Sequence, residues 1–375
     1  MKTTVLRFAA GDRALARRFT RFPFDLYRGV PQWVPPIGAD ERAKLSPRHP
    51  FYRHSQAAFF LAEDARGSVR GRLALLDHRL HNAYSREHTA FFCLFECVDD
   101  LPTARALFDA GAEWAAARGL DCLFGPKGFT ALDGLGLLVR GFEHRPALGQ
   151  VYNPPYYLDL LAGCGFAPAG REILSGYLPG SVALPAKVEQ VAARMQERGW
   201  LRVRSFGSRV ELRALVRDLP ALYNGAMVGT ESGTPLTLEE ARAMANQLLL
   251  FADPRLIKLI YKEDTPVGFL LAYPDVSAAV QRCGGRFFPL GWLYLLLELR
   301  RAQWININGA GIIDRYRGLG GTALLFSEMA KSVRLRGTPH AEVVQIGAEN
   351  ERMLNELRGL GVDFYKAHQM YRRAL

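Results

Sequence analysis

The turn Gly318-Leu319-Gly320-Gly321 has the residue types and spacing best suited to bind an anion. It follows an apolar run, Trp304 to Ile313, that predicts a strand, and it precedes a run with helical spacing, Thr322 to Arg336. Because glycine has no Cβ atom, the main chain there can take positive φ and approach a ligand closely. The amides of the turn and of the first helical turn would lack partners at the positive end of the helix dipole. We expect them to bind a phosphate or diphosphate, and a tight connection without a ligand is the alternative.

The spacing excludes two common phosphate loops. A Walker loop requires Lys followed by Ser or Thr after its last glycine, whereas Thr322-Ala323 stands here, and the dinucleotide fingerprint Gly-x-Gly-x-x-Gly is not satisfied. The segment instead resembles the acyl-CoA loop of the GNAT acetyltransferase superfamily, Arg/Gln-x-x-Gly-x-Gly/Ala. The run from Arg317 to Thr322 fits this pattern up to its last position, and the run from Arg315 to Gly320 fits it completely.

The resemblance implies that acetyl-CoA or another acyl-CoA is the cosubstrate, and it implies no metal. Arg315 or Arg317 would add positive charge to the loop. The pantetheine arm would pair with the strand at 308–312, and Asn350 would meet the arm unless it serves only as a helix cap. The residues expected to contact the cofactor are Gly311, Ile312, Arg315, Arg317, Gly318, Leu319, Gly320, Gly321, Thr322 and Asn350.

Acyl transfer to an amine needs a base for the amine proton and a proton donor for the departing thiolate. Glu342, on an expected strand at 341–346, is the candidate base, directly or through water, and a surface or salt-bridged role is the alternative. Many GNAT enzymes carry a tyrosine seven residues after the asparagine that matches Asn350, where this chain has Leu357. Tyr365 and Tyr371, near the expected terminal strands, are therefore the candidate substitutes for the thiolate donor.

The chain repeats this layout. Arg105 to Gly119 and Ala323 to Gly337 align without a gap, and each continues into a strand-like run and then an asparagine suited to cap a helix, Asn153 or Asn350. Both halves predict the order β-α-α-β-β-β-α-β-α-β. We therefore expect an α/β fold (α+β, with mixed sheets) made of two tandem GNAT-like domains, a degenerate one at 1–178 and an acyl-CoA-binding one at 179–375.

The two copies differ where the glycine loop is expected. The first copy has Val98-Asp99-Asp100-Leu101-Pro102-Thr103 at that place, without glycine and with two carboxylates that would repel a diphosphate. Asp100 or Thr103 is suited to cap the following helix instead. The sequence thus assigns the cofactor to the second copy alone.

Other strings resemble a bacterial family of two-lobed, GNAT-like proteins of unassigned substrate. They are Pro31 to Pro36, His49-Pro50-Phe51, Phe91 to Glu96, Gly125-Pro126 and Tyr152 to Tyr157. These strings indicate kinship and do not identify a reaction.

Composition sets the remaining limits. The 375 residues carry a net charge of +11, without a Lys/Arg block or a zinc-finger spacing, so the sequence does not favour a nucleic-acid partner. Five cysteines without a Cys-x-x-Cys motif predict a reduced, cytoplasmic protein. The apolar segment 287–299 is too short to cross a bilayer and contains Glu298. We expect it to be a buried helix, and a helix lying on a membrane or on a partner is the alternative.

Three histidines, His78, His81 and His88, lack the spacing of a metal site, and we expect them in a solvated loop. Taken together, these features predict an N-acyltransferase that moves an acyl group from acyl-CoA to a small-molecule or peptide amine by direct attack on the thioester. An aminoacyl-tRNA-dependent transferase and a non-catalytic acyl-CoA-binding protein are the alternatives. The acceptor, the acyl length and the oligomeric state are not specified by the sequence.

Overall fold

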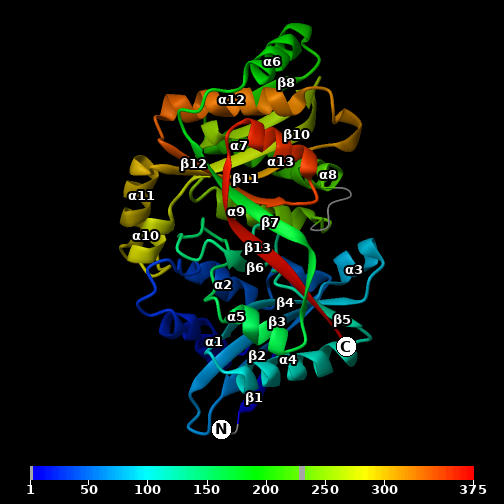
Figure 1. Cartoon of the computed structure of the whole chain (residues 1–375), viewed down its shortest axis with the longest axis vertical. Helices are drawn as coiled ribbons and strands as arrows, with labels where there is room; N and C mark the ends of the chain where they lie inside the picture. The colour runs from blue at the N-terminus through cyan, green and yellow to red at the C-terminus, as the bar shows by residue number, and fades with distance from the viewer. Residues whose placement is uncertain (1–2, 228–232) are drawn as a thin grey trace. The chain divides into compact units, whose positions relative to one another are not determined.

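The computed structural model describes residues 3–227 and 233–375, and its contacts divide the chain into two compact units. The first unit contains Met1–Ile173, Ser277–Tyr294 and Lys366–Leu375, and the second contains Leu174–Val276 and Leu295–Tyr365. Figure 1 shows the elements of both units. The long strands β7 (Ala167–Pro179) and β13 (Asp363–Ala374) each contribute residues to both units.

The first unit is a mixed sheet with helices on its faces. Its strands lie in the order β1-β2-β3-β4-β5-β13, and β6 also pairs with β13. Neighbouring strands are antiparallel except for β4 and β5, which are parallel. The strands are β1 (Thr4–Phe8), β2 (Gln56–Glu63), β3 (Val69–Asp77), β4 (Thr89–Cys97), β5 (Cys122–Gly125) and β6 (Leu137–Arg140); the helices are α1 (Arg13–Leu26), α2 (Gly38–Lys44), η1 (Pro50–Arg53), α3 (Arg79–Ser85), α4 (Leu101–Ala116), α5 (Tyr157–Gly163) and α10 (Ser277–Arg282).

The second unit repeats this plan, with strands in the order β7-β12-β11-β10-β9-β8 and a parallel pair at β11 and β12. Its strands after β7 are β8 (Arg202–Ser205), β9 (Ile257–Lys262), β10 (Thr265–Pro274), β11 (Trp304–Ile312) and β12 (His340–Gly347). Its helices are α6 (Ala186–Arg198), α7 (Arg209–Ala214), η2 (Leu215–Arg217), α8 (Leu219–Ala226), α9 (Leu238–Leu248), η3 (Pro254–Leu256), the second half of α11 (Gly291–Arg301), η4 (Asp314–Tyr316), α12 (Gly321–Arg336) and α13 (Glu351–Gly359).

This element order confirms the predicted α/β fold with mixed sheets. Part of the last strand of each half lies in the unit formed mainly by the other half. Residues of β13 from Tyr371 to Ala374 pair with β5 in the first unit, and β7 is the neighbour of β12 in the sheet order. The repeat boundaries 1–178 and 179–375 stay a prediction, because these units are defined by contacts and are discontinuous in sequence.

Alternating side chains build a core on both faces of each sheet. In the first unit, Phe92 packs with α4 and α5 on one face, and Phe91 packs with η1 and α1 on the other. In the second unit, Ile305 packs against α12 and α6, while Phe269 packs against α8 on the opposite face. Since the side chains of successive strand residues point to opposite faces, each strand serves two cores.

Helix caps follow the sequence signals at Asp100 and Thr237 and depart from them at Asn153. Asp100 caps α4 by accepting from the amide of Thr103, which confirms one predicted cap. The Thr237-Glu240 pair forms a reciprocal capping box at α9. Asn153, predicted as a cap, instead accepts from the Leu138 amide at 2.8 Å and donates to the Leu138 carbonyl at 3.2 Å. That prediction is wrong, because the Asn153 amide group ties a loop to strand β6.

Two burial predictions are also wrong. The segment 287–299 is not a buried helix, because most of its large apolar side chains are exposed. His78 and His81 are not in a solvated loop: both are buried, and their rings pack against Phe51 and Phe91 respectively. Burial lowers the pKa of His78 to about 3 and that of His81 to about 4, since a buried imidazole loses the hydration of its charged form.

Candidate functional site

The parallel strands β11 and β12 pair only over their first halves. Their register runs from Trp304 opposite His340 to Ile307 opposite Val343. Beyond this point β11 contains a bulge, in which two residues, 308 and 309, stand opposite one residue of β10. Gly309 has φ +111°, a conformation that favours glycine. The last residues of β11 therefore continue toward the glycine loop without pairing to β12.

The glycine loop has the conformation that its sequence predicts. Gly318 and Gly320 have φ of +80° and +84°, and Gly320 is the residue immediately before α12. A Cβ atom at Gly320 would lie 2.9 Å from Met195 Cγ and 3.1 Å from Val191 Cγ1, both on α6. At Gly318 a Cβ atom would meet nothing within 4 Å. Gly320 is thus required both by its φ and by its close packing, whereas Gly318 is required only by its φ.

The amides of this loop are not used by the fold. Within residues 3–227 and 233–375, the amides of residues 318 to 323 donate no hydrogen bond, and the first such bond of α12 runs from Leu324 to the Gly320 carbonyl at 3.2 Å. Gly318 and Leu319 are exposed. Gly320 is half-buried and Gly321 is buried. The loop therefore holds amides without a partner in the described part of the fold at the positive end of a 16-residue helix, and unpaired amides at such a helix end can bind phosphate groups.

The two arginines of the loop have different surroundings. Arg317 donates through Nε to the Ile312 carbonyl at 3.0 Å and through Nη2 to the Ala226 carbonyl at 2.8 Å, so it fastens the loop to β11 and α8. Arg317 also pairs with Asp314 at 3.2 Å. Arg315 is exposed, and its guanidinium lies over the Tyr316 ring at 4.9 Å. Arg315 can therefore move toward an anion by leaving the Tyr316 ring, whereas Arg317 would have to release two hydrogen bonds to carbonyl groups and an ion pair.

The two predicted catalytic residues lie together. Glu342 on β12 is 4% exposed, so the alternative of a surface glutamate is wrong. Burial raises the pKa of the Tyr365 phenol well above its usual range, and the charge of Glu342 and a hydrogen bond to it raise that pKa further. Tyr365 thus stays protonated at neutral pH and donates its proton toward the Glu342 carboxylate.

A row of polar side chains that the sequence analysis missed lies beside Glu342. Tyr273 on β10 is in register with Asn306 on β11, and Asn306 is in register with Glu342 on β12. Asn306 donates to Asp275 at 3.4 Å, and Asn308 donates to the Tyr273 hydroxyl at 3.2 Å. The signal was present in β11, where asparagines at 306 and 308 alternate with isoleucines at 305 and 307, but their partners are fixed only by strand register.

The other predicted residues are more widely spread. Asn350 caps α13 by accepting from the Met353 amide at 3.2 Å. Leu357, at the position of the usual tyrosine, is 3% exposed and belongs to the core around β12. Tyr371 lies in the first unit, where it is in register with Gly125. Of the two candidate tyrosines, the structure therefore brings only Tyr365 to Glu342.

Neither a metal site nor a membrane-crossing helix is found among the described residues. Among the described residues, no cluster of three or more His, Cys, Asp or Glu side chains has a geometry that could hold a metal ion. None of the described helices has both the length and the apolar composition that a bilayer crossing requires.

Comparison with known proteins identifies solved structures that share this fold. No family model matches the sequence. A solved "Tandem GNAT protein from the clavulanic acid biosynthesis pathway" superposes with a TM-score of 0.57 at 11% identity, covering 100% of this chain and 98% of that one. The fold is that of a tandem GNAT protein. A probable N-acyltransferase from Enterococcus faecalis V583 has the same likeness at a TM-score of 0.51 and 8% identity, over 100% of this chain and 73% of its own.

Two curated proteins resemble the chain along nearly its whole length. Protein YghO of Escherichia coli K12 is 25% identical over 370 residues, which are 96% of this chain and 93% of that protein. The bacterial ceramide synthase of Caulobacter vibrioides is 25% identical over 374 residues, 96% of this chain and 94% of that protein. The tandem GNAT fold therefore extends over the full chain, with the glycine loop between β11 and α12 of its second unit.

Proposed function

We propose that the second unit binds acetyl-CoA or another acyl-CoA and that the protein transfers the acyl group to an amine. The observation that carries this proposal is the glycine loop, whose amides from 318 to 323 donate to no group in the described part of the fold. A diphosphate on this loop would accept from several of these amides at once. Each bond is charge-assisted, and the dipole of α12 adds to the attraction.

The loop also supplies selectivity for a large anion. Arg315 would turn from the Tyr316 ring to a phosphate oxygen, while Arg317 would keep the loop in place through the Ile312 and Ala226 carbonyls. The end of β11, including Gly311 and Ile312, pairs with β10 but not with β12, so its edge on the β12 side would offer main-chain groups to the pantetheine arm. Asn350 would add its side-chain N–H₂ to the arm while its oxygen continues to cap α13.

Glu342 and Tyr365 would carry out the proton transfers. The amine nitrogen attacks the thioester carbonyl carbon, so that a C–N bond forms and the C–S bond breaks. Glu342 accepts the proton that the nitrogen loses, directly or through water, and Tyr365 gives its proton to the departing sulfur. Tyr365 recovers a proton from Glu342 through the hydrogen bond between them. The products are an amide and free CoA, and no covalent enzyme intermediate is needed.

The acceptor would be a small-molecule or peptide amine, and a long-chain amine belongs among the candidates. One relative carries the name ceramide synthase, and a ceramide is by definition the N-acyl derivative of a long-chain amine. That likeness is at 25% identity, so it gives a candidate acceptor class for testing and does not assign one.

The test measures binding and turnover on the same preparation. We expect CoA, at concentrations well above micromolar, to raise the melting temperature by several °C, because a ligand that binds only the folded state stabilises it by mass action. Acetyl-CoA and a long-chain acyl-CoA are then mixed with a panel of polyamines, peptides and long-chain amines. Release of free thiol and the mass of the amide report transfer.

The outcomes separate an acyltransferase from a non-catalytic acyl-CoA-binding protein. Transfer to any amine of the panel supports the proposal, and binding of CoA without transfer to any of them favours a non-catalytic acyl-CoA-binding protein. Absence of a thermal shift with CoA and with every acyl-CoA overturns the proposal.

A further inference from the structure

An exposed apolar surface is formed by residues 288–297, at the start of α11 and in the turn before it. Its large side chains are exposed by 42% for Leu293 up to 89% for Phe288. Its members are Phe288, Leu290, Trp292, Leu293, Tyr294, Leu296 and Leu297. We call this set the α11 surface. Soluble proteins rarely expose so many large apolar side chains in one stretch, and such patches commonly bind a partner or a membrane.

The α11 surface occupies a defined side of the helix. Trp292, Leu293, Leu296 and Leu297 recur at intervals of four residues and are all exposed, while Gly291 and Leu295 are buried. Leu295 on the buried side is 8% exposed. The helix therefore has apolar residues on two sides. One side packs on the protein, and the other faces outward. With 11 residues it can lie on a bilayer but is far shorter than the ~20 residues that cross one.

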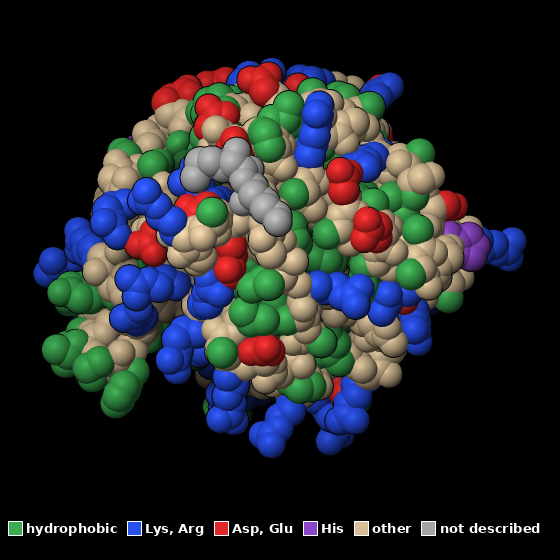
Figure 2. Space-filling view, turned by 90° about the horizontal axis from the view of Figure 1, so that it is seen from below, with side chains coloured by type: hydrophobic (Ala, Val, Ile, Leu, Met, Phe, Trp, Pro, Cys, Tyr) green, Lys and Arg blue, Asp and Glu red, His purple; other side chains and the backbone are tan. Residues whose placement is uncertain are grey.

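Positive charge borders the α11 surface at both of its ends. Arg282 and Arg286 precede it and Arg300 and Arg301 follow it, and all four are exposed. Glu298 is the one acidic residue between positions 277 and 303. Figure 2 shows hydrophobic side chains protruding as a group at the lower left, with Lys and Arg side chains beside them. Apolar side chains between arginines match the layers of an anionic lipid surface, where acyl chains lie beneath negative headgroups.

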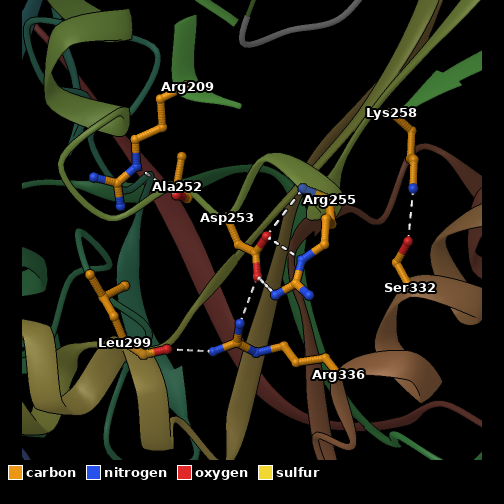
Figure 3. A network of polar contacts seen from close by, with 8 residues as sticks. All are labelled: Arg209, Ala252, Asp253, Arg255, Lys258, Leu299, Ser332 and Arg336. Carbon is orange, nitrogen blue, oxygen red and sulfur yellow. Dashed lines mark hydrogen bonds and ion pairs between the residues drawn. The ribbon is translucent and has the colours of Figure 1, made fainter. Parts of the chain in front are cut away.

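The C-terminal end of α11 is fastened by a polar network, shown in Figure 3. Arg336, at the end of α12, donates to the Leu299 carbonyl at 2.6 Å and pairs with Asp253 at 2.6 Å. Asp253 is held in turn by two hydrogen bonds from the Arg255 guanidinium, at 3.0 and 2.8 Å. The helix end is thus fixed through the Leu299 carbonyl, one of the last-turn carbonyl groups that have no acceptor role within the helix.

The segment before α11 is fastened within the first unit. Gln281 of α10 donates to the Pro31 carbonyl at 2.8 Å and to the Trp33 carbonyl at 2.9 Å. The Gly38 amide donates to the Gly285 carbonyl at 3.0 Å, and Val280 is fully buried. Because both flanks are held by specific contacts, the exposure of residues 288–297 is not the result of a loosely attached helix.

We propose that the α11 surface is a membrane-docking surface that binds anionic phospholipid bilayers. Phe288, Leu290 and Trp292 enter the boundary between headgroups and acyl chains, and Arg286, Arg300 and Arg301 bind lipid phosphates. This places the protein on a lipid surface irrespective of which amine accepts the acyl group, and it requires no acyl-CoA. A second copy of the chain is the competing occupant, since an apolar face can also be buried in a dimer.

The test uses the full chain and vesicles of phosphatidylcholine with or without an equal part of phosphatidylglycerol. We expect the protein to float with the vesicles that contain phosphatidylglycerol. The variant W292S/L296S/L297S lowers the bound fraction more than about tenfold, because it removes apolar area that the bilayer would bury. The variant R300E/R301E lowers binding to the anionic vesicles at least about tenfold and abolishes its dependence on salt.

Matched controls lie elsewhere on the surface. Leu335→Ser removes a leucine that is 87% exposed on α12, and Arg194→Glu reverses an exposed charge on α6. Both variants should float like the wild type. Circular dichroism melting of the triple variant checks folding, which we expect to be preserved because the three side chains are already about half exposed. As a second measurement, brominated lipids should quench the fluorescence of the wild type more than that of Trp292→Phe.

Several outcomes would overturn the proposal. They are absence of wild-type binding to either vesicle, equal binding by the triple variant, and loss of binding in the two controls to the same extent. Sedimentation velocity without lipid gives a further one, because a wild-type dimer that the triple substitution converts to a monomer would assign the α11 surface to self-association. CoA thermal shifts measured on the same variants keep this result separate from the proposed activity, since the vesicle assay needs no cosubstrate.

Discussion

The two halves of the protein use the same strand-to-helix connection in opposite ways. In the first unit the connection before α4 contains Asp100, whose carboxylate accepts from the Thr103 amide at 3.1 Å and from the Thr103 hydroxyl. In the second unit the connection before α12 contains Gly318 and Gly320, and no side chain of the described residues caps the helix. The start of the first helix has a hydrogen-bond partner in its own sequence, whereas the start of the second has none in the part of the chain that the structure describes. Under the proposed function, the phosphate oxygen atoms of the cosubstrate would take that place at the second helix start.

A second difference concerns buried carboxylates. In the first unit Glu96 accepts from the hydroxyls of Tyr27 at 2.5 Å and Tyr157 at 2.8 Å, and burial raises its pKa to about 7. In the second unit Glu342 has the Tyr365 hydroxyl as a donor. Tyr27 and Tyr157 also hold other parts of the first unit, since Tyr157 accepts from the Cys97 amide at 2.9 Å. We infer that the first carboxylate serves stability and the second serves the reaction.

The largest effect should come from removing the base in the second unit. Glu342→Gln keeps the shape of the side chain but accepts no proton, so we expect kcat/KM for acyl transfer to fall about 10²- to 10⁴-fold. The thermal shift with CoA should stay within about 1 °C of the wild type, because Glu342 lies outside the glycine loop. Tyr365→Phe should lower kcat with little change in KM.

The matched change in the first unit is Glu96→Gln. If the comparison is right, this variant retains transfer activity within about threefold of the wild type. Loss of activity equal to that of Glu342→Gln, with an unchanged melting temperature, would place a second reaction centre in the first unit and contradict the assigned division of roles.

Glu96 should instead change how stability depends on pH. Its folded pKa, about 7, lies above the value of 4.5 expected for the unfolded chain, so the folded state binds the extra proton between these two values. The stabilisation is therefore fully present below pH 4.5 and is lost as the pH rises through 7. We expect the free energy of unfolding of the wild type, relative to Glu96→Gln, to fall by about 2 kcal/mol between pH 5 and pH 8.

Urea unfolding at a series of pH values measures this difference. The variant is a suitable reference, because a glutamine can still accept the Tyr27 and Tyr157 hydrogen bonds and does not titrate. A difference that stays flat, or that rises with pH, would show that Glu96 is already ionised in the folded state at pH 5.

Features that depend on a few neighbouring residues could be predicted from the sequence. The cap at Asp100, the capping box at Glu240 and the positive φ at Gly320 all follow from local backbone requirements. Local signals also identified Glu342 as a strand residue, although they could not tell whether it was exposed.

Features that depend on strand register or on what covers a helix could not be predicted. The row of Tyr273, Asn306 and Glu342 exists because three strands align at those positions, and no spacing in one strand shows its neighbours. The outward side of α11 has the same residue types as its buried side, so hydropathy alone favoured burial. Asn153 met the composition of a cap but found its partners in β6.

A smaller effect should separate the two glycines of the loop. Gly318 and Gly320 both have positive φ, but only at Gly320 would a Cβ atom meet α6, at 2.9 Å from Met195 Cγ. We expect Gly320→Ala to lower the affinity for CoA about tenfold, because the loop must shift and its amides no longer converge. Gly318→Ala should lower it by less than about threefold. Calorimetric titration with CoA measures both.

Gly318→Ala and Gly320→Ala share the strain of a positive φ, so the difference between them isolates the effect of packing against α6. Equal losses of affinity would mean that positive φ alone matters and that packing on α6 does not hold the loop. Unchanged affinity in both would contradict the placement of the diphosphate on these amides.

The smallest effect should come from Asn350, where two roles can be separated. The side-chain oxygen caps α13 through the Met353 amide, and the proposed contact to the pantetheine arm uses the N–H₂ group. Asn350→Ser keeps a cap, since serine caps about as well as asparagine, but it removes the amide donor. We expect it to lower CoA affinity about threefold to fivefold with an unchanged melting temperature, because one neutral hydrogen bond contributes about 1 kcal/mol.

Asn350→Ala removes both roles and should combine the same loss of affinity with a loss of about 1 kcal/mol in stability. Titration with CoA gives the affinity of each variant, and urea unfolding gives the stability of each. All four values must match the two-role model. If Asn350→Ser has the CoA affinity and the stability of the wild type while Asn350→Ala loses both, Asn350 is a structural cap alone. The second half would then resemble the first at this point, since both would use a polar side chain only to hold the fold, and the difference between the halves would narrow to the glycine loop and the Glu342–Tyr365 pair.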